Sequence, residues 1–373
     1  MSARVEPGAP GRPLGREEKI LGIIETARSK RPKFRDERIT MAHGAGGKAT
    51  AALIEGVLVP AFASPALDQL ADAGAIEVGG AQLAMTTDSF VVKPLRFPGG
   101  SIGELAVNGT VNDLAVAGAR PLALSLSLIL EEGLEADVLR AEVAAIAASA
   151  HAADVQIVTG DTKVVERGCA EKLYICTTGI GVRDPRARLA PTALRPGDRV
   201  IVSGPIGEHG TAIMLARGEF ELGATIESDT RPLWPAVDAL LEAAGPGLRC
   251  LRDATRGGVA SVLNELARAS GVALLVHERA VPVHPIVAGA AELLGIDPMH
   301  VANEGVFVAV VAPEHADAAL AALQAAGDGA TFAQAAEIGE VKTEPPGMVL
   351  VETAFGGKRV MDQLVGDPLP RIC

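Results

Sequence analysis

From residue 39 onward, apolar positions fall into short stretches that follow either a strand period or a helix period. The run at 81–94 is rich in β-forming residues, and residues 103–118 carry apolar side chains at helical spacing. Residues 122–130 are nearly all apolar, which predicts a strand buried in a sheet. The pattern further predicts a helix at 135–153, strands at 155–160, 174–181, 199–204 and 306–311, and a last hairpin within 348–364.

A charged, proline-bearing stretch at 183–198 lacks apolar periodicity and predicts a domain boundary. With 373 residues and 48% hydrophobic content, the chain can build two separate cores. We therefore expect domains at 39–182 and 195–364, followed by a mobile tail at 365–373. Residues 1–38 hold ten Lys or Arg against six Asp or Glu, and we expect a disordered basic extension there.

The net charge of -12 argues against a general nucleic-acid binder, which needs a positive surface to neutralise phosphates. No uninterrupted apolar run approaches the length of a membrane span. The chain has four cysteines without a C-x-x-C pair, and no signal peptide is recognisable. This combination predicts reduced thiols in a cytoplasmic protein.

A glycine loop at 43–48 lies between a short strand-like run and a predicted helix at 49–57. Glycines allow backbone N–H groups to approach an anion closely, which suits phosphate binding. Gly44, Gly46 and Ala49 also fit the G-x-G-x-x-A pattern of dinucleotide sites. The third alternative is a flexible surface loop with no ligand.

Polar residues interrupt three of the predicted elements. Asp88 lies within the predicted strand 81–94, and Asn108, Asn112 and Asp113 gather on one stripe of the helix at 103–118. Carboxylates and carboxamides on one face suit Mg²⁺, although a solvated polar face has the same pattern. Asp161 follows a predicted strand directly, where it could bind a metal or cap a β-turn.

The chain ends on a thiol, Cys373, that has no evident partner. Pro368 and Pro370 favour an extended, semi-rigid arm. An arm from Gly366 to Cys373 can span roughly 25 Å. It is either a frayed end with an accidental cysteine or a carrier for a functional thiol.

Together these motifs resemble the HypE carbamoyl dehydratase family, a branch of the PurM-like (AIR synthetase and selenophosphate synthetase) ATP-binding superfamily. The resemblance covers the chain from about residue 39 to its end, and the terminal Pro-Arg-Ile-Cys distinguishes this branch from its relatives. The motifs that carry it are His43-Gly-Ala-Gly-Gly-Lys48, Thr87-Asp-Ser-Phe90, Val111-Asn-Asp-Leu-Ala115, Gly160-Asp-Thr-Lys-Val-Val165, Asp253-Ala-Thr-Arg-Gly-Gly258, Asn303-Glu-Gly305 and Pro370-Arg-Ile-Cys373.

The resemblance implies an α+β, two-domain PurM-like fold, with an N-terminal domain that forms a dimeric β-barrel-type interface and a C-terminal α/β sandwich. It also implies ATP- and Mg²⁺-dependent dehydration of a carbamoyl group on the C-terminal cysteine to S-cyanide, for the cyanide ligands of [NiFe]-hydrogenase. The implied partners are a second copy of the chain, the carbamoyltransferase HypF and a HypC–HypD complex that accepts the cyanide.

Under that reading each candidate residue takes a role. Metal binding is expected from Asp72, Asp88, Asp113 and Asp161, and nucleotide binding from Gly44, Gly46, Gly47, Lys48, Asn108, Asn112 and Thr162. The catalytic residues are expected to be Cys373 as the carrier, Glu304 as the proton acceptor, and Lys163 and Asp113 beside the phosphates.

Three alternatives stay open. The first is a superfamily kinase or synthetase that acts on a soluble small molecule, of the selenophosphate or thiamine phosphate type. The second is a dinucleotide-dependent oxidoreductase, which rests on the glycine loop alone. The third is a scaffold whose arm docks a partner.

Overall fold

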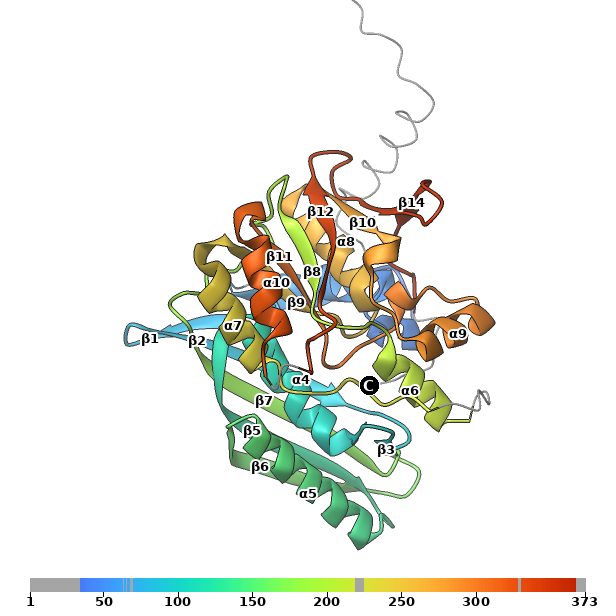
Figure 1. Cartoon of the computed structure of the whole chain (residues 1–373). Coiled ribbons are helices and arrows are strands. Elements are labelled where there is room, and N and C mark those ends of the chain that lie inside the picture. The colour runs from blue at the N-terminus through green and yellow to red at the C-terminus, as the bar shows by residue number, and fades with distance from the viewer. Residues whose placement is uncertain are drawn as a thin grey trace, which may run out of the picture.

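The computed structural model describes residues 34–62, 64, 66–67, 70–218, 225–327 and 330–366. Two β-sheets organise this part of the chain, and each has its own helices (Figure 1). Helix α4 lies between the two sheets, so it contributes to both cores. The expected α+β class is confirmed.

The first sheet has five strands in the order β1-β2-β7-β5-β6. The β5–β6 pair is parallel, and the other neighbouring pairs are antiparallel. Its elements are β1 (Gly74–Val78), β2 (Ala81–Phe90), α4 (Ile102–Val116), β5 (Ala119–Glu131), α5 (Ala136–Ala152), β6 (Gln156–Val165) and β7 (Leu173–Arg183), with a small β3–β4 ribbon (Arg96–Phe97, Gly100–Ser101).

Only one face of this sheet is covered by helices. Strand β7 alternates between buried residues that face α4 and α5 and more exposed residues on the other face, as a half-buried strand should. Strand β5 has the same asymmetry, and Leu122 is 46% exposed. The prediction that 122–130 is fully buried was therefore wrong, because the described chain places no layer on the second face.

Strand β6 differs from its prediction in length. The expected strand ended at Gly160, but the observed strand continues to Val165. Gly160 lies so close to β5 that a Cβ atom there would approach the Leu126 carbonyl oxygen within 2.2 Å. This glycine therefore marks a close approach of two backbones inside the sheet and does not end the strand.

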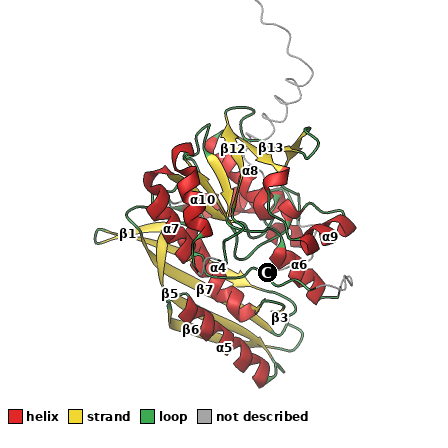
Figure 2. Ribbon diagram, viewed as in Figure 1, coloured by secondary structure: helices red, strands yellow, loops and turns green. Residues whose placement is uncertain are grey.

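The second sheet has seven strands in the order β14-β13-β10-β12-β8-β11-β9. Helices cover both of its faces, with α7 and α10 on one side and α8 on the other (Figure 2). Its principal elements are β8 (Arg199–Val202), α6 (Glu208–Ala216), α7 (Trp234–Ala244), β9 (Leu248–Asp253), α8 (Gly258–Ser270), β10 (Ala273–His277), α9 (Pro285–Leu294), β11 (Phe307–Val311), α10 (Ala316–Gln324), β12 (Ala336–Lys342), β13 (Val349–Glu352) and β14 (Lys358–Met361).

The sequence of β8 explains this sandwich. Val200 and Val202 pack against α8, while Ile201 packs against α7 and α10. Because both faces are buried, the strand is a continuous apolar run with no polar alternation. Short 3₁₀ segments connect these elements: η4 (Gly245–Gly247), η5 (Glu278–Ala280), η6 (Pro298–His300) and η7 (Pro313–His315).

The segment before the first sheet packs against the second sheet's domain. It contains η1 (Met41–Gly44), α2 (Lys48–Leu53), a π-helical turn η2 (Ile54–Leu58) and α3 (Val59–Phe62). The glycine loop, residues 43–48, contacts the turn before α8 and the chain after β14. Within the described residues, no helix has both the length and the apolar character required to cross a membrane.

Candidate active site

Three carboxylates converge where the two sheets meet. Oxygen atoms of Asp72, Asp113 and Asp253 lie within 4.8 Å of one another, and we call these residues the acidic cluster. Asp72 precedes β1, Asp113 lies in the last turn of α4, and Asp253 ends β9. The cluster forms because α4 packs between β9 and the first sheet, which brings three distant segments together.

Burial and mutual repulsion make these carboxylates hard to ionise without a cation. Burial raises the pKa of Asp72 to about 6, although the Arg252 guanidinium opposes the rise. Burial raises the pKa values of Asp113 and Asp253 well above their ordinary range, and neighbouring carboxylates add to both shifts. A divalent cation would relieve this repulsion.

Strand β2 supplies two more polar groups to the cluster. The Thr86 hydroxyl lies 2.6 Å from Asp113 Oδ2 and 3.0 Å from the Asp72 carbonyl oxygen. Burial raises the pKa of Asp88, while the Arg256 charge and a hydrogen bond with Asp113 lower it. Asp88 is thus the residue that links the acidic cluster to Arg256.

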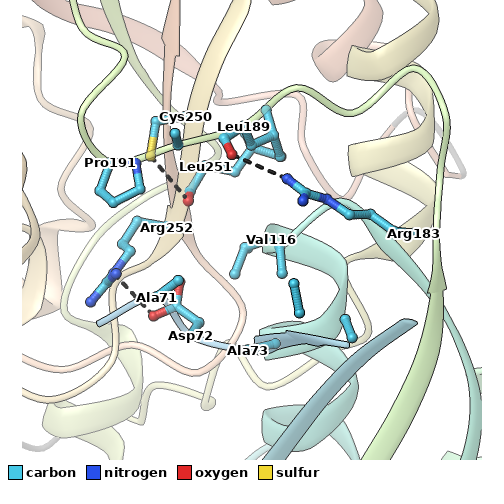
Figure 3. Close-up of a pocket in the computed structure, with 14 residues that line it drawn as sticks. Ala71, Asp72, Ala73, Val116, Arg183, Leu189, Pro191, Cys250, Leu251 and Arg252 are labelled. Carbon is cyan, nitrogen blue, oxygen red and sulfur yellow. Dashed lines mark hydrogen bonds and ion pairs between the residues drawn. The ribbon is translucent and has the colours of Figure 1, made fainter. Parts of the chain in front are cut away.

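Arg252 balances part of the negative charge. Its Nε lies 3.0 Å from Asp72 Oδ1, and its Nη2 lies 2.9 Å from Glu265 Oε2. Its third contact is the Leu70 carbonyl oxygen, 2.9 Å from Nη1. Figure 3 shows the Arg252–Asp72 pair on the wall of a cavity between the domains, which the aliphatic residues Ala71, Val116 and Leu251 also line.

Glu304 lies deeper in the same region and its backbone is held from two sides. Its N–H donates to Asp229 Oδ1 at 2.9 Å, and its carbonyl oxygen accepts from Asn112 Nδ2 at 3.1 Å. Burial raises the pKa of Glu304 well above its ordinary range, and Asp229, Asp253 and Asp88 raise it further. The carboxyl group is therefore poised to hold a proton at higher pH than an exposed glutamate would.

Some of the site residues predicted from the sequence lie together in the structure, and others do not. Asp72, Asp88, Asp113 and Glu304 come together between the domains, and Asp253 joins them although no role was predicted for it. The signal that could have identified Asp253 is its position between a strand and the Gly257–Gly258 helix start. Such ends of strands commonly carry site residues.

The two asparagines of α4 are used for contacts between the domains. Asn112 Nδ2 donates to the Arg231 carbonyl oxygen at 2.9 Å as well as to Glu304, and its Oδ1 accepts from Leu233 N–H at 2.8 Å. Asn108 Nδ2 donates to Thr230 Oγ1 at 3.1 Å. These bonds engage both ends of the Asn112 amide, whereas the buried Oδ1 of Asn108 has no hydrogen-bond partner among the described residues.

The structure does not bring Asp161, Thr162 and Lys163 to the acidic cluster. They lie on β6, which is separated from β2 by β7 and β5, so three strand spacings give a distance of about 14 Å from Asp88. Register pairing places Asp161 opposite Ser127, on the uncovered face, whereas Asp88 pairs with Thr177 on the helix-covered face. Lys163 Nζ lies 3.0 Å from Asp161 Oδ2, and this hydrogen bond lowers the pKa of Asp161.

The glycine loop makes several contacts within the chain. The Gly46 N–H donates to Thr50 Oγ1 at 3.0 Å, and the Lys48 N–H donates to the Leu364 carbonyl oxygen at 2.9 Å. Lys48 Nζ contacts Asp362 Oδ2 at 2.7 Å. These groups, expected to face a triphosphate, are therefore bonded within the chain, while Cys373 lies outside the described residues.

Comparisons with known proteins place the fold in one class. The AIR synthase related protein N-terminal domain matches residues 70–183, and the AIR synthase related protein C-terminal domain matches residues 195–351. The fold and its interdomain acidic site thus define a two-domain, PurM-like protein of the AIR synthase related class.

Closer relatives identify the branch. Carbamoyl dehydratase HypE of Rhodobacter capsulatus is 50% identical over 342 residues, covering 91% of this chain and 99% of the relative. The chain belongs to the carbamoyl dehydratase HypE family.

Solved structures agree with this assignment. A HypE–HypF complex matches with a TM-score of 0.79 and 42% identity, covering 84% of this chain and all of the matched chain. HypE in complex with ATP matches with a TM-score of 0.75 and 43% identity, covering 90% and 100% of the two chains.

Proposed function

We propose that this chain catalyses the ATP-dependent dehydration of a carbamoyl group on Cys373 to a thiocyanate, which supplies cyanide for [NiFe]-hydrogenase maturation. One observation carries the proposal beyond family membership. The C-terminal segment, residues 361–366, passes beside the 253–258 turn, and Arg256 of that turn interacts with both Asp88 and Glu304. The last described residue, Gly366, is seven residues before Cys373. It lies beside the turn that carries Arg256, and therefore close to the acidic cluster.

The reaction must remove the carbamoyl oxygen, which is a poor leaving group. Transfer of the γ-phosphoryl group of ATP to the carbamoyl oxygen, with loss of one N–H proton, gives an imidate phosphate and ADP. Loss of the second N–H proton forms the C≡N bond and breaks the C–O bond, which releases phosphate. The protein must therefore position the thiocarbamate, neutralise phosphate charge and accept a proton.

Carboxylate oxygens within 4.8 Å of one another, with raised pKa values, fit the preference of Mg²⁺ for oxygen ligands. Asp72, Asp88, Asp113 and Asp253 would hold the ion, which neutralises phosphate charge when bound. Arg256 supplies a positive charge that interacts with both Asp88 and Glu304. Glu304 accepts the nitrogen proton, because burial raises the pKa of its carboxyl group and makes the carboxylate a stronger base than that of an exposed glutamate.

A homodimer would explain how residues on β6, which lie far from the acidic cluster of their own chain, could take part in a site. The uncovered face of the first sheet exposes apolar side chains, among them Met85 at 45% and Val182 at 40%. A second copy that covers this surface would bury them. Asp161 and Lys163, which share the uncovered face, would then face the partner subunit, where they can contact a nucleotide that they cannot reach within their own chain, whereas Thr162 points to the opposite face of β6.

The proposed partners follow from the reaction. HypF supplies the carbamoyl group, since a HypE–HypF complex is among the matched structures, and a HypC–HypD complex accepts the cyanide. We place the reaction in the cytoplasm. The described cysteines Cys169, Cys176 and Cys250 are free, as expected in a reducing compartment.

The alternative is a kinase or synthetase of the same superfamily that acts on a soluble small molecule. An ATPase assay separates the two functions. Carbamoylation of the chain should raise ATP hydrolysis in the wild type and have no effect in Cys373→Ala. Equal hydrolysis by carbamoylated wild type and Cys373→Ala would contradict a substrate carried on Cys373.

A further inference from the structure

The C-terminal segment, residues 361–366, is held on one side by helix α8. Asn264 Nδ2 donates to the Met361 carbonyl oxygen at 3.2 Å. Gln363 is buried, its Oε1 accepts from Arg268, and its Nε2 donates to Glu265 Oε1 at 3.3 Å. The chain beyond β14 is therefore fixed in register along α8.

The glycine loop and the start of α2 hold the same segment from the opposite side. The Lys48 N–H donates to the Leu364 carbonyl oxygen at 2.9 Å, and the Ala49 N–H donates to the Val365 carbonyl oxygen at 3.3 Å. Lys48 Nζ adds an ion pair with Asp362 Oδ2 at 2.7 Å. Two backbone bonds and one ion pair thus join positions more than 300 residues apart in the sequence.

Two glycines of the loop differ in the space around them. A Cβ atom on Gly47 would lie 2.4 Å from the Leu364 carbonyl oxygen, whereas a Cβ atom on Gly44 would meet nothing within 4 Å. The backbone of Gly47, with φ -103 and ψ -160, is open to other residues, so its conformation does not require glycine. What requires a glycine at position 47 is the close approach of the C-terminal segment.

We propose that the glycine loop and α8 form a clamp on residues 361–366, and that Gly47 and Lys48 are positioning residues for the substrate arm. This inference rests on the proposed function, because the arm has a substrate only if Cys373 is carbamoylated. The clamp fixes Gly366, which lines the same small pocket as Gly257 of the turn that carries Arg256. The arm therefore starts beside the acidic site.

The clamp limits the volume that the reacting group can explore. Seven residues follow Gly366, so Cys373 can reach at most about 25 Å from this root. If the clamp opened as far as Met361, twelve residues would be free. Because effective concentration falls roughly as the −3/2 power of tether length, the rate of a tethered reaction would fall about twofold.

Hydrogen exchange of the Lys48 and Ala49 amides in the full-length protein tests the clamp directly. We expect both amides to be protected in the wild type and in Gly44→Ala. In Gly47→Ala we expect about tenfold faster exchange, because the new methyl group displaces the acceptor carbonyls. Unchanged protection in Gly47→Ala, together with weaker ATP binding, would overturn the clamp and favour a phosphate-binding loop.

Exchanging the charges of Lys48 and Asp362 provides a second test. Both side chains are exposed, so their substitution should not disturb folding. Lys48 and Asp362 are 47% and 43% exposed, so Lys48→Glu should fold normally and destabilise only the contact. Single-turnover dehydration of the carbamoylated protein should slow about twofold in Lys48→Glu. Lys48→Glu/Asp362→Lys should recover the wild-type rate, and failure of this rescue would contradict the clamp.

The two tests separate the clamp from the proposed function. A wild type with protected Lys48 and Ala49 amides but no dehydration of carbamoylated Cys373 would support the clamp and overturn the function. A wild type that dehydrates Cys373 while these amides exchange freely would support the function and overturn the clamp.

Discussion

The acidic cluster is costly to bury without a cation, since each carboxylate raises the pKa of its neighbours. In Asp113→Asn, one source of repulsion is lost while an acceptor for the Thr86 hydroxyl remains. We expect this variant to unfold at the same or a higher temperature without metal. Mg²⁺ should stabilise the wild type by about 1–3 kcal/mol and this variant by much less.

Thermal unfolding with and without Mg²⁺ measures this effect. Asp161→Asn is the matched control, because Asp161 lies on the uncovered face of β6 and should leave the stabilisation by Mg²⁺ intact. The opposite pattern, with stabilisation lost in Asp161→Asn and kept in Asp113→Asn, would contradict a metal site at the acidic cluster.

Asp229 makes stability depend on pH. Burial raises its pKa from the ordinary 3.8 to about 6, so the folded protein holds this proton more tightly than the unfolded chain does. The contribution of Asp229 to stability is complete below pH 4 and is lost as pH rises through about 6. A difference of that size corresponds to about 3 kcal/mol as an upper value.

Asp229→Asn keeps an acceptor for the Glu304 N–H and removes the charge. Relative to wild type, its free energy of unfolding should be similar at pH 4 and higher by about 1–3 kcal/mol at pH 7. Denaturant titrations across this range give the comparison, with the exposed Asp137→Asn as control. A constant difference at all pH values would show that Asp229 does not titrate as described.

A residue of the site could be predicted from the sequence where a local pattern of neighbouring residues marks it. Asp88 within a strand and Asp113 on a polar helical stripe were predicted from pattern and meet in the structure. Asp253 was missed because its nearest carboxylates come from segments about 140 and 180 residues earlier in the sequence. Its position at the end of a strand marks Asp253 as a candidate, but no local pattern tells which carboxylates it meets.

At the level of elements, α4 connects the two domains. The Asn112 side chain makes hydrogen bonds to Arg231, Leu233 and Glu304, all from the second domain's segments. In Asn112→Ala, the Leu233 N–H and two carbonyl groups lose a buried partner. We expect a loss of about 2–4 kcal/mol in the free energy of unfolding, measured by denaturant titration.

A solvated polar helix face, one of the alternatives for this stripe, would give a different result. Asn112→Ala would then change stability by less than about 0.5 kcal/mol. Asn112 is 1% exposed, which is why the larger value is expected.

The elements themselves were predicted well where the apolar period was uninterrupted. The predicted helix at 135–153 is α5, and the predicted hairpin is β13 with β14. The prediction ended strand β6 too early, at Gly160, because glycine is more common at the ends of strands than inside them. Here Gly160 lies inside the strand, where it allows a close approach of two backbones. The partial exposure of β5 could not be predicted, since a sequence does not state which sheet faces lack a covering layer.

At the level of the whole molecule, the uncovered sheet face predicts self-association. Met85→Lys combined with Val182→Lys places two charges on this uncovered apolar face. We expect a monomer for this variant and a dimer for the wild type by light scattering after size exclusion. Leu293→Lys on α9, where Leu293 is 72% exposed, is the control and should remain dimeric. A wild type that is monomeric at all concentrations would contradict the proposed dimer.

The central claim is that the chain's own C-terminal cysteine carries the group that is dehydrated. The most direct measurement is the mass of the C-terminal peptide from carbamoylated protein before and after addition of ATP and Mg²⁺. We expect the loss of one water from a single site, Cys373, with ADP and phosphate released in equal amounts. Consumption of ATP with the carbamoyl mass unchanged on Cys373 would contradict it.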